Sequence, residues 1–150
     1  MFRIQQTEHV GEVEKAFNYV FNDPSSVHKA LQLPGSQLGG DNRALAQLGD
    51  FVLRLSLAEE GYVKGKSRAH VDSILQQLAT IGKAAEIGFL YSLDRVIYKN
   101  PSQLGAISPK SMAATVHALV GAIYLDSGKD INRVKVALQA VTLAWPESST

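Results

Sequence analysis

Residues 42–62, NRALAQLGDFVLRLSLAEEGY, form the longest helical pattern that carries an ionisable residue, Asp50, inside an apolar run. Four apolar residues recur at spacings of three and four, which places them on one stripe of a helix: Leu45, Leu48, Val52 and Leu55. Three more widen the apolar surface beyond that stripe: Phe51, Leu53 and Leu57. Because a helix that is apolar on most sides is usually buried, we predict a central helix here.

The sequence around this stretch predicts where the helix begins and ends. Residues 39–42, GGDN, supply a flexible lead-in and an N-cap candidate. Gly61 is a candidate for the C-terminal stop, because glycine adopts the left-handed conformation that ends many helices.

Periodicity and turn residues predict further helices at residues 10–21, 24–31, 69–80, 81–89, 110–125 and 130–144. The pattern is ambiguous over residues 95–108, where the segment 96–98, VIY, fits either a short strand or a surface turn. No internal repeat and no linker divides the chain. We therefore predict one all-α domain over residues 1–150.

The amino-acid composition limits the classes of function and the cellular locations that we expect for this chain. Fifteen basic and fourteen acidic residues give a net charge of +1, so any RNA binding must come from local charge placement. The absence of cysteine excludes disulfides and thiolate metal sites and favours an intracellular location, whether cytoplasmic, nuclear or mitochondrial. No window is apolar enough for a membrane span, and the first residues resemble neither a signal nor a transit peptide. We expect no membrane partner.

Two motifs resemble the signature helices of the RNase III domain family, whose members cut double-stranded RNA. Residues 48–53, LGDFVL, resemble the core of the family's ERLEFLGDAVL. Residues 109–126, PKSMAATVHALVGAIYLD, resemble its later PKxLADxFEALIGAIYLD. Residues 84–93, AAEIGFLYSL, resemble its AxELGLxxxL turn, in which we expect Gly88 to adopt the left-handed conformation at a helix end. The resemblance implies an RNase III endonuclease-domain-like helical fold.

The family's catalysis uses two Mg²⁺ ions held by four carboxylates, two from each signature helix. The matching positions here are Ala46, Asp50, Ala114 and His117, so only Asp50 retains a carboxylate. Alanine cannot bind a metal, and a neutral imidazole is a poor ligand for Mg²⁺ although it accepts Mn²⁺ or Zn²⁺. The resemblance therefore implies a degenerate, catalytically depleted member, for which Mg²⁺ or Mn²⁺ is a cofactor only if activity is retained.

Other interpretations of these residues stay open. Carboxylates from elsewhere could rebuild the metal site, and the candidates by type are Asp41, Glu59, Glu60, Asp72, Asp94 and Asp126. Two of them, Asp41 and Glu59, lie nine residues from Asp50, roughly 13 Å along a helix axis. Without the resemblance, Asp50 fits a hydrogen-bonded structural carboxylate, His117 an interior or interface histidine, and Asp126 a helix-end cap.

Two glycines inside the predicted helices, Gly49 and Gly121, each cost about 1 kcal/mol relative to alanine. We expect them to permit close approach of the two signature helices.

The sequence also suggests contact surfaces. Lys64, Lys66 and Arg68 form a basic cluster that can neutralise RNA phosphates, with Lys99 and Lys110 as further candidates; the alternative is a solvated loop. In the family the first signature helix forms the dimer interface, and an aromatic residue after its first metal carboxylate docks into the partner subunit. That position is Gln47 here, with Leu48 and Phe51 beside it. The resemblance implies a homodimer, or a heterodimer with a related domain.

These observations favour a non-catalytic scaffold that binds double-stranded or structured RNA, or a protein, and that is similar to the RNase III-like proteins of the mitochondrial large ribosomal subunit. The alternative is an active, metal-dependent double-stranded RNA endonuclease with a remodelled site, acting in RNA processing. A third reading is an unrelated helical module. We expect no double-stranded-RNA-binding domain after the last helix.

Overall fold

The computed structural model describes residues 2–103 and 105–147. Its helices in chain order are α1 (Phe2–Phe17), α2 (Ser25–Ala30), α3 (Arg43–Val63), α4 (Arg68–Leu78), α5 (Ile81–Leu90), the 3₁₀ helix η1 (Leu93–Arg95), α6 (Pro109–Asp126) and α7 (Ile131–Ala140). The described residues contain no strand, and the ambiguous segment makes one isolated parallel bridge, between Gln32 and Tyr98. The predicted all-α class is confirmed.

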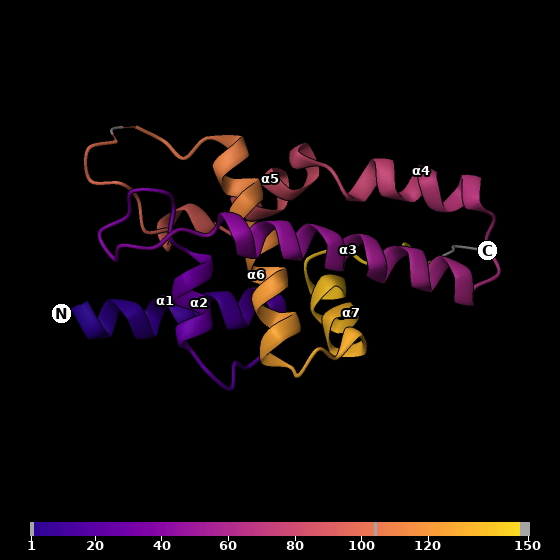
Figure 1. Ribbon diagram of the computed structural model, residues 1–150, viewed down its shortest axis with the longest axis horizontal. Helices are drawn as coiled ribbons and strands as arrows, with labels where there is room; N and C mark the ends of the chain where they lie inside the picture. Colours follow the sequence, from indigo (N-terminus) through magenta and orange to yellow (C-terminus); the bar gives the residue numbers. More distant parts are fainter. Residues whose placement is uncertain (1, 104, 148–150) are drawn as a thin grey trace.

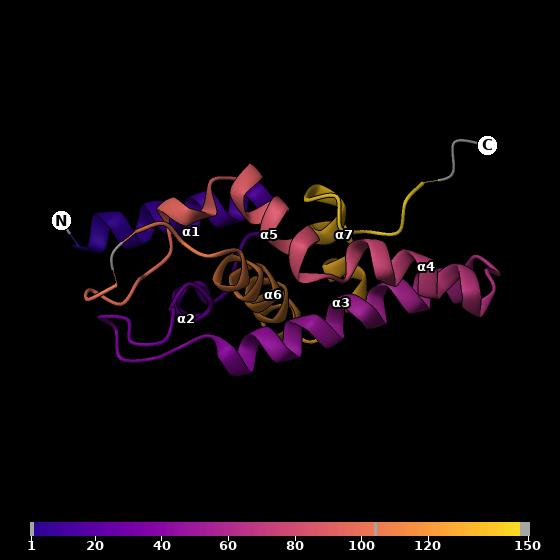
Figure 2. The same cartoon turned by 90° about the horizontal axis from the view of Figure 1, so that it is seen from above.

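Helix α6 occupies the centre of the molecule. Every residue from Met112 to Ile123 except Ala114 is buried. Figure 2 shows α6 between α3 and α5, with the long α3 along one side of the molecule; in Figure 1 the same helix crosses the middle of the view. The prediction that residues 42–62 form the central helix is therefore wrong, because α3 buries one face against α6 and leaves Phe51 and Leu55 exposed.

Short polar caps fix where several helices begin. The Ser108 hydroxyl accepts a hydrogen bond from the backbone N–H of Ser111, and Pro109 fills the first turn of α6. Thr80 caps α5 in the same way by accepting from the N–H of Lys83. These caps lie within two residues of the predicted boundaries, because a cap depends only on its immediate neighbours in sequence.

The close approach of the two signature helices is confirmed. A Cβ atom built on Gly49 would collide with the backbone carbonyl of His117. One built on Gly121 would lie 2.7 Å from the carbonyl oxygen of Leu45. Glycine at both positions lets the α3 and α6 backbones pack directly against each other.

Two other predictions about glycines are wrong. Gly88 lies inside α5, where its missing side chain makes room for Met112; the left-handed residue is Ser92, which precedes η1 with a φ of 56°. Gly61 does not end α3, which continues to Val63. A Cβ atom there would lie within 2.7 Å of Trp145, so its role is packing against the C-terminal segment.

Candidate functional site

The crossing of α3 and α6 brings Asp50 close to His117, two of the four positions that the resemblance assigns to a metal site. Asp50 follows Gly49, whose backbone packs against His117. One turn before Ala46, the Asn42 side chain donates hydrogen bonds to the Ala30 carbonyl, at 2.9 Å, and to the Thr115 hydroxyl, at 3.3 Å. Two segments far apart in sequence thus meet where the resemblance places a catalytic centre.

Asp50 is held by an arginine one turn away. Its Oδ1 accepts a hydrogen bond from Arg54 Nε at 3.1 Å, and Arg54 Nη2 donates to the carbonyl of Ala79 at 3.1 Å. Ala79 follows the last turn of α4, where carbonyl oxygens lack helical partners and attract cations. The Arg54 guanidinium therefore joins Asp50 to the end of α4. It places a positive charge beside the one retained carboxylate.

Sequence reasoning did not single out Arg54. The signal was present, because an acidic and a basic residue four positions apart on a helix lie next to each other. The hydrogen bond to Ala79 depends on how α4 folds back beside α3, which the sequence pattern does not reveal.

His117 is buried, with 8% of its surface exposed. Its Nε2 is enclosed and has no hydrogen-bond partner among the described residues. Burial lowers the pKa of His117; Asp50 opposes this shift and Arg54 adds to it. The ring is therefore neutral at neutral pH and lies beside the Asp50–Arg54 pair without forming a hydrogen bond to it within the described part of the chain.

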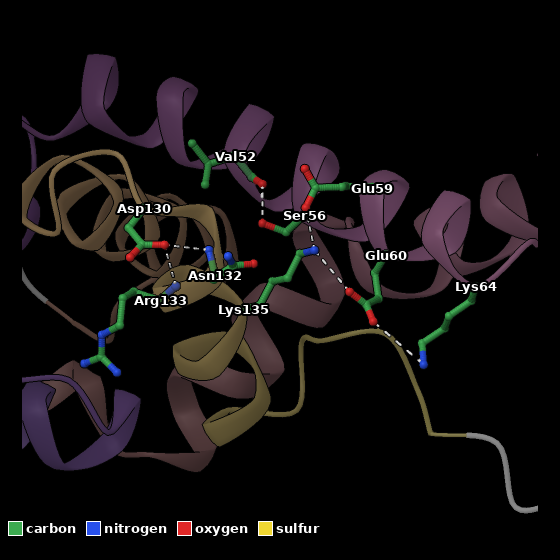
Figure 3. Close-up of polar contacts among 9 residues, drawn as sticks. All are labelled: Val52, Ser56, Glu59, Glu60, Lys64, Asp130, Asn132, Arg133 and Lys135. Carbon is green, nitrogen blue, oxygen red and sulfur yellow. Dashed lines mark hydrogen bonds and ion pairs between the residues drawn. The ribbon is translucent and has the colours of Figure 1, made fainter.

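The carboxylates that could have rebuilt the metal site are mostly engaged elsewhere. Asp41 pairs with Arg43 at 3.0 Å and Asp72 with Arg68 at 3.8 Å. Figure 3 shows Lys135 of α7 between Glu59 and Glu60, at 2.6 and 3.1 Å.

The Asp126 carboxylate binds the turn between α1 and α2 through hydrogen bonds. It accepts hydrogen bonds from the Tyr19 hydroxyl at 2.7 Å and from the N–H groups of Asn22 and Asp23 at 2.8 Å each. Its structural role is confirmed, but the prediction that it caps the end of its own helix is wrong, because its carboxylate bonds a turn more than 100 positions away in sequence.

The donor set does not fit a pair of divalent cations. Alanine occupies two of the four positions, Asp50 is paired with Arg54, and His117 is a neutral imidazole. Across residues 2–103 and 105–147, no group of three histidine or acidic side chains gathers around a possible metal position. Two-metal phosphodiester chemistry needs several oxygen ligands, which this arrangement does not supply.

The predicted basic residues do not form one surface. Lys64 and Lys66 lie on the connection between α3 and α4, and Arg68 is the first residue of α4. Lys64 pairs with Glu60 at 3.7 Å, and Arg68 pairs with Asp72. The α6 N-terminus, which carries Lys110, lies well away from this connection in both ribbon views (Figures 1 and 2).

The outer face of α3 is apolar and exposed. Phe51 is 62% exposed and Leu55 is 51% exposed, and they lie one turn apart. Gln47 lies one turn before Phe51 and is exposed, whereas Leu48 is half-buried. Leu55 was not among the dimer candidates Gln47, Leu48 and Phe51, so the exposed apolar surface is larger than those candidates indicated. No described helix is both long and apolar enough to cross a bilayer.

The sequence relatives of this chain include several bacterial proteins named ribonuclease 3. No family model matches the chain. The chain is 28% identical to ribonuclease 3 of Vibrio atlanticus over 145 residues, covering 93% of this chain and 61% of the relative. It is 32% identical to ribonuclease 3 of Idiomarina loihiensis over 144 residues, covering 91% and 58%. The chain therefore spans about three fifths of the length of the curated relatives that it matches.

Solved structures show the same fold. The nuclease domain of ribonuclease III from Campylobacter jejuni superposes with a TM-score of 0.74 at 22% identity, covering 93% of this chain and 98% of that one. A second structure of that domain, described for flexibility in its region involved in dimer formation, gives a TM-score of 0.73 at 21% identity, covering 92% and 99%. Sequence relatives and fold agree with the two signature motifs: the chain is similar in sequence to ribonuclease 3 and has the fold of an RNase III nuclease domain, and both findings support the RNase III domain family.

Proposed function

We propose that this chain is a non-catalytic RNase III domain that acts as a scaffold for structured RNA and for a second domain of its own kind. The observation that carries this proposal is the state of Asp50. The one retained carboxylate is paired with Arg54 at 3.1 Å, and two of the other three metal-ligand positions, Ala46 and Ala114, are alanine. A site with this charge balance has little affinity for Mg²⁺, which binds through carboxylates.

Cleavage of a long double-stranded RNA tests the proposal directly. Wild type and Asp50→Asn are compared in Mg²⁺ and separately in Mn²⁺, and we expect no cleavage above background from either protein. Cleavage by wild type that disappears in Asp50→Asn would overturn the proposal in favour of the alternative, an endonuclease with a remodelled metal site. Cleavage shared by both proteins reports a contaminating nuclease, which repurification removes.

A reconstruction tests the site assignment separately. Ala46→Glu, Ala114→Asp and His117→Glu together restore the family's carboxylates, and adding Arg54→Gln frees Asp50 from its partner. We expect calorimetry to detect Mn²⁺ binding by the triple variant and tighter binding by the quadruple variant. Absence of Mn²⁺ binding in both folded variants would contradict the alignment of these four positions.

We assign RNA contact to the connection between α3 and α4. Lys66 is the informative residue, because the charges of Lys64 and Arg68 are each shared with a carboxylate one turn away. A lysine that neutralises a phosphate contributes about one unit to the salt dependence of RNA affinity. Lys66→Gln should therefore reduce the slope of log affinity against log salt by about one unit, and Lys29→Gln on α2 should leave it unchanged.

We assign the apolar outer face of α3 to pairing with a second copy of the chain, and a related RNase III-like domain is the alternative partner. Phe51 and Leu55 supply the exposed apolar side chains that anchor such an interface. Gln47 stands where the family has an aromatic anchor, so Phe51 and Leu55 carry the contact in this proposal.

A further inference from the structure

A polar hollow of about 480 Å³ lies between α1, the α2–α3 loop and the loop that follows η1. A volume of this size lies within the range of small-molecule sites. Tyr98, which lines the hollow, is held by two backbone hydrogen bonds: its N–H donates to the Leu31 carbonyl at 2.9 Å, and Leu33 N–H donates to the Tyr98 carbonyl at 3.0 Å. The hollow is therefore built on a hydrogen-bonded frame, and it uses neither Asp50 nor His117.

The charge in this hollow is entirely positive. Arg95 and Lys99 line it, and no carboxylate does. Within residues 2–103 and 105–147, Arg95 forms no ion pair, and the Lys99 ammonium makes one hydrogen bond, to the Gly105 carbonyl at 3.2 Å. In a chain with a net charge of only +1, two cations without acidic partners facing one cavity indicate an anionic ligand.

The remaining lining supplies hydrogen-bonding groups and one aromatic ring. The Tyr98 ring lies between two histidines, with its centroid 5.1 Å from that of His9 and 5.9 Å from that of His28. His9 Nδ1 is enclosed and has no hydrogen-bond partner in the described part of the chain. Gln5 and Gln37 add side-chain amides that both donate and accept. Amide groups of this kind can match the mixed donor and acceptor edge of a nucleobase.

We propose that this hollow binds a nucleotide through its terminal phosphate, with Arg95 and Lys99 holding the phosphate and the amides of Gln5 and Gln37 contacting the base. A phosphomonoester carries a charge of about −1.5 to −2 at neutral pH, which matches two uncompensated cations better than an internal phosphodiester does. The same chemistry is presented by a free mononucleotide and by the 5′-phosphorylated end of an RNA. The proposal does not depend on whether the α3–α6 site cleaves RNA.

Binding is measured by calorimetry on the full chain with five probes: adenosine 5′-monophosphate, inorganic phosphate, a tetraglutamate peptide, and one short single-stranded RNA bearing either a 5′-phosphate or a 5′-hydroxyl. We expect saturable binding of the mononucleotide, of the phosphorylated RNA, or of both. The double variant Arg95→Gln/Lys99→Gln should weaken it at least about tenfold, because each charge-assisted hydrogen bond contributes more than a neutral one. Lys29→Gln, which removes an exposed lysine outside the hollow, should bind as wild type does.

The relative affinities of the five probes identify the ligand or overturn the proposal. Binding of the phosphorylated RNA alone identifies an RNA end as the ligand, and equal binding of the mononucleotide identifies a free nucleotide. Equal affinity for the 5′-hydroxyl RNA, for inorganic phosphate or for the peptide overturns the proposal, as does the absence of saturable binding by wild type.

Circular dichroism confirms that the variants are folded, and Arg95→Lys should retain part of the affinity because it keeps the charge. Nuclear magnetic resonance should show ligand-dependent shifts at His9, and unperturbed His9 signals would also contradict the site.

Discussion

At Gly49, the packing of two helices depends on one absent Cβ atom. The α6 carbonyl of His117 occupies the space that an alanine methyl group would need, and the neighbouring atoms are backbone, which cannot rotate away. Interiors this dense accommodate an added carbon only by moving a helix.

Gly49→Ala should lower the free energy of unfolding by about 3 kcal/mol or more, because the methyl group forces α3 away from α6. Urea denaturation measures the loss. Gly11→Ala is the matched control, since Gly11 lies inside α1 with open space around it, and we expect a gain of up to about 1 kcal/mol. Equal effects of the two substitutions would contradict the close contact.

His117 should make stability depend on pH below about 6.5. Burial lowers its pKa in the folded protein, so as pH falls through the ordinary histidine pKa of about 6.5 the unfolded chain takes up a proton that the folded chain does not. The folded state therefore loses stability on acidification, and above that range His117 contributes no pH dependence. His117→Gln should remove this contribution.

Urea denaturation at pH 7.5 and pH 5.5 measures the effect as a difference between proteins. Because burial also lowers the pKa values of His9 and His28, wild type and His117→Gln are compared for the change between the two pH values. His70→Gln serves as the control at an exposed histidine. An identical pH dependence in wild type and His117→Gln would show that His117 is not buried as a neutral ring.

Between elements, a single carboxylate at the end of α6 organises the turn that joins α1 to α2. Asp126 accepts from the Tyr19 hydroxyl and from two backbone N–H groups of that turn. Burial and the hydrogen bond to Asp126 raise the pKa of Tyr19, which keeps its hydroxyl protonated and donating. Elements more than 100 positions apart in sequence are thereby linked.

Asp126→Ala should lower the free energy of unfolding by about 2 kcal/mol or more, because it leaves two N–H groups and a part-buried hydroxyl without their acceptor. Thermal and urea denaturation measure the loss. Asp94→Ala, at an exposed carboxylate in η1, should change stability by less than about 0.5 kcal/mol. An Asp126→Ala variant with the same free energy of unfolding as wild type would contradict the linking role.

For the whole molecule, two exposed apolar side chains of α3, Phe51 and Leu55, face away from α6. Phe51 and Leu55 leave apolar surface in water that a second protein surface would cover. If the domain pairs through this face, Asp50 and Arg54 lie next to the interface, because they adjoin the same two residues in sequence.

Phe51→Ser/Leu55→Ser should convert a dimer to a monomer, because it removes the apolar side chains from the centre of the proposed interface. Sedimentation equilibrium over a concentration series measures the change. Val20→Ser, at a residue 75% exposed on the α1–α2 turn, should leave the assembly unchanged. A wild-type chain that stays monomeric throughout the series would exclude the homodimer and direct attention to a related domain.

Features encoded over short windows were predicted well. The all-α class and most of the helix boundaries follow from apolar periodicity and from caps such as Ser108 and Thr80, which act within a few residues. Gly49 and Gly121 indicated close helix packing, because glycine inside a helix is costly unless its small size is used. The replacement of three metal-ligand positions is a property of the sequence itself once the family motifs are aligned.

Features that depend on how helices pack were not predictable in this way. Apolar content placed α3 at the centre, yet α6 holds that position, because burial is decided by which neighbours surround a helix and not by its own composition. The link from Arg54 to Ala79 and the hollow around Arg95 and Lys99 join residues from separate segments. The sequence by itself determined the helices and the resemblance to the RNase III domain family, because both follow from local patterns of residues. Only the tertiary structure decided which charges are paired and which cavities exist, because both arise from contacts between distant segments.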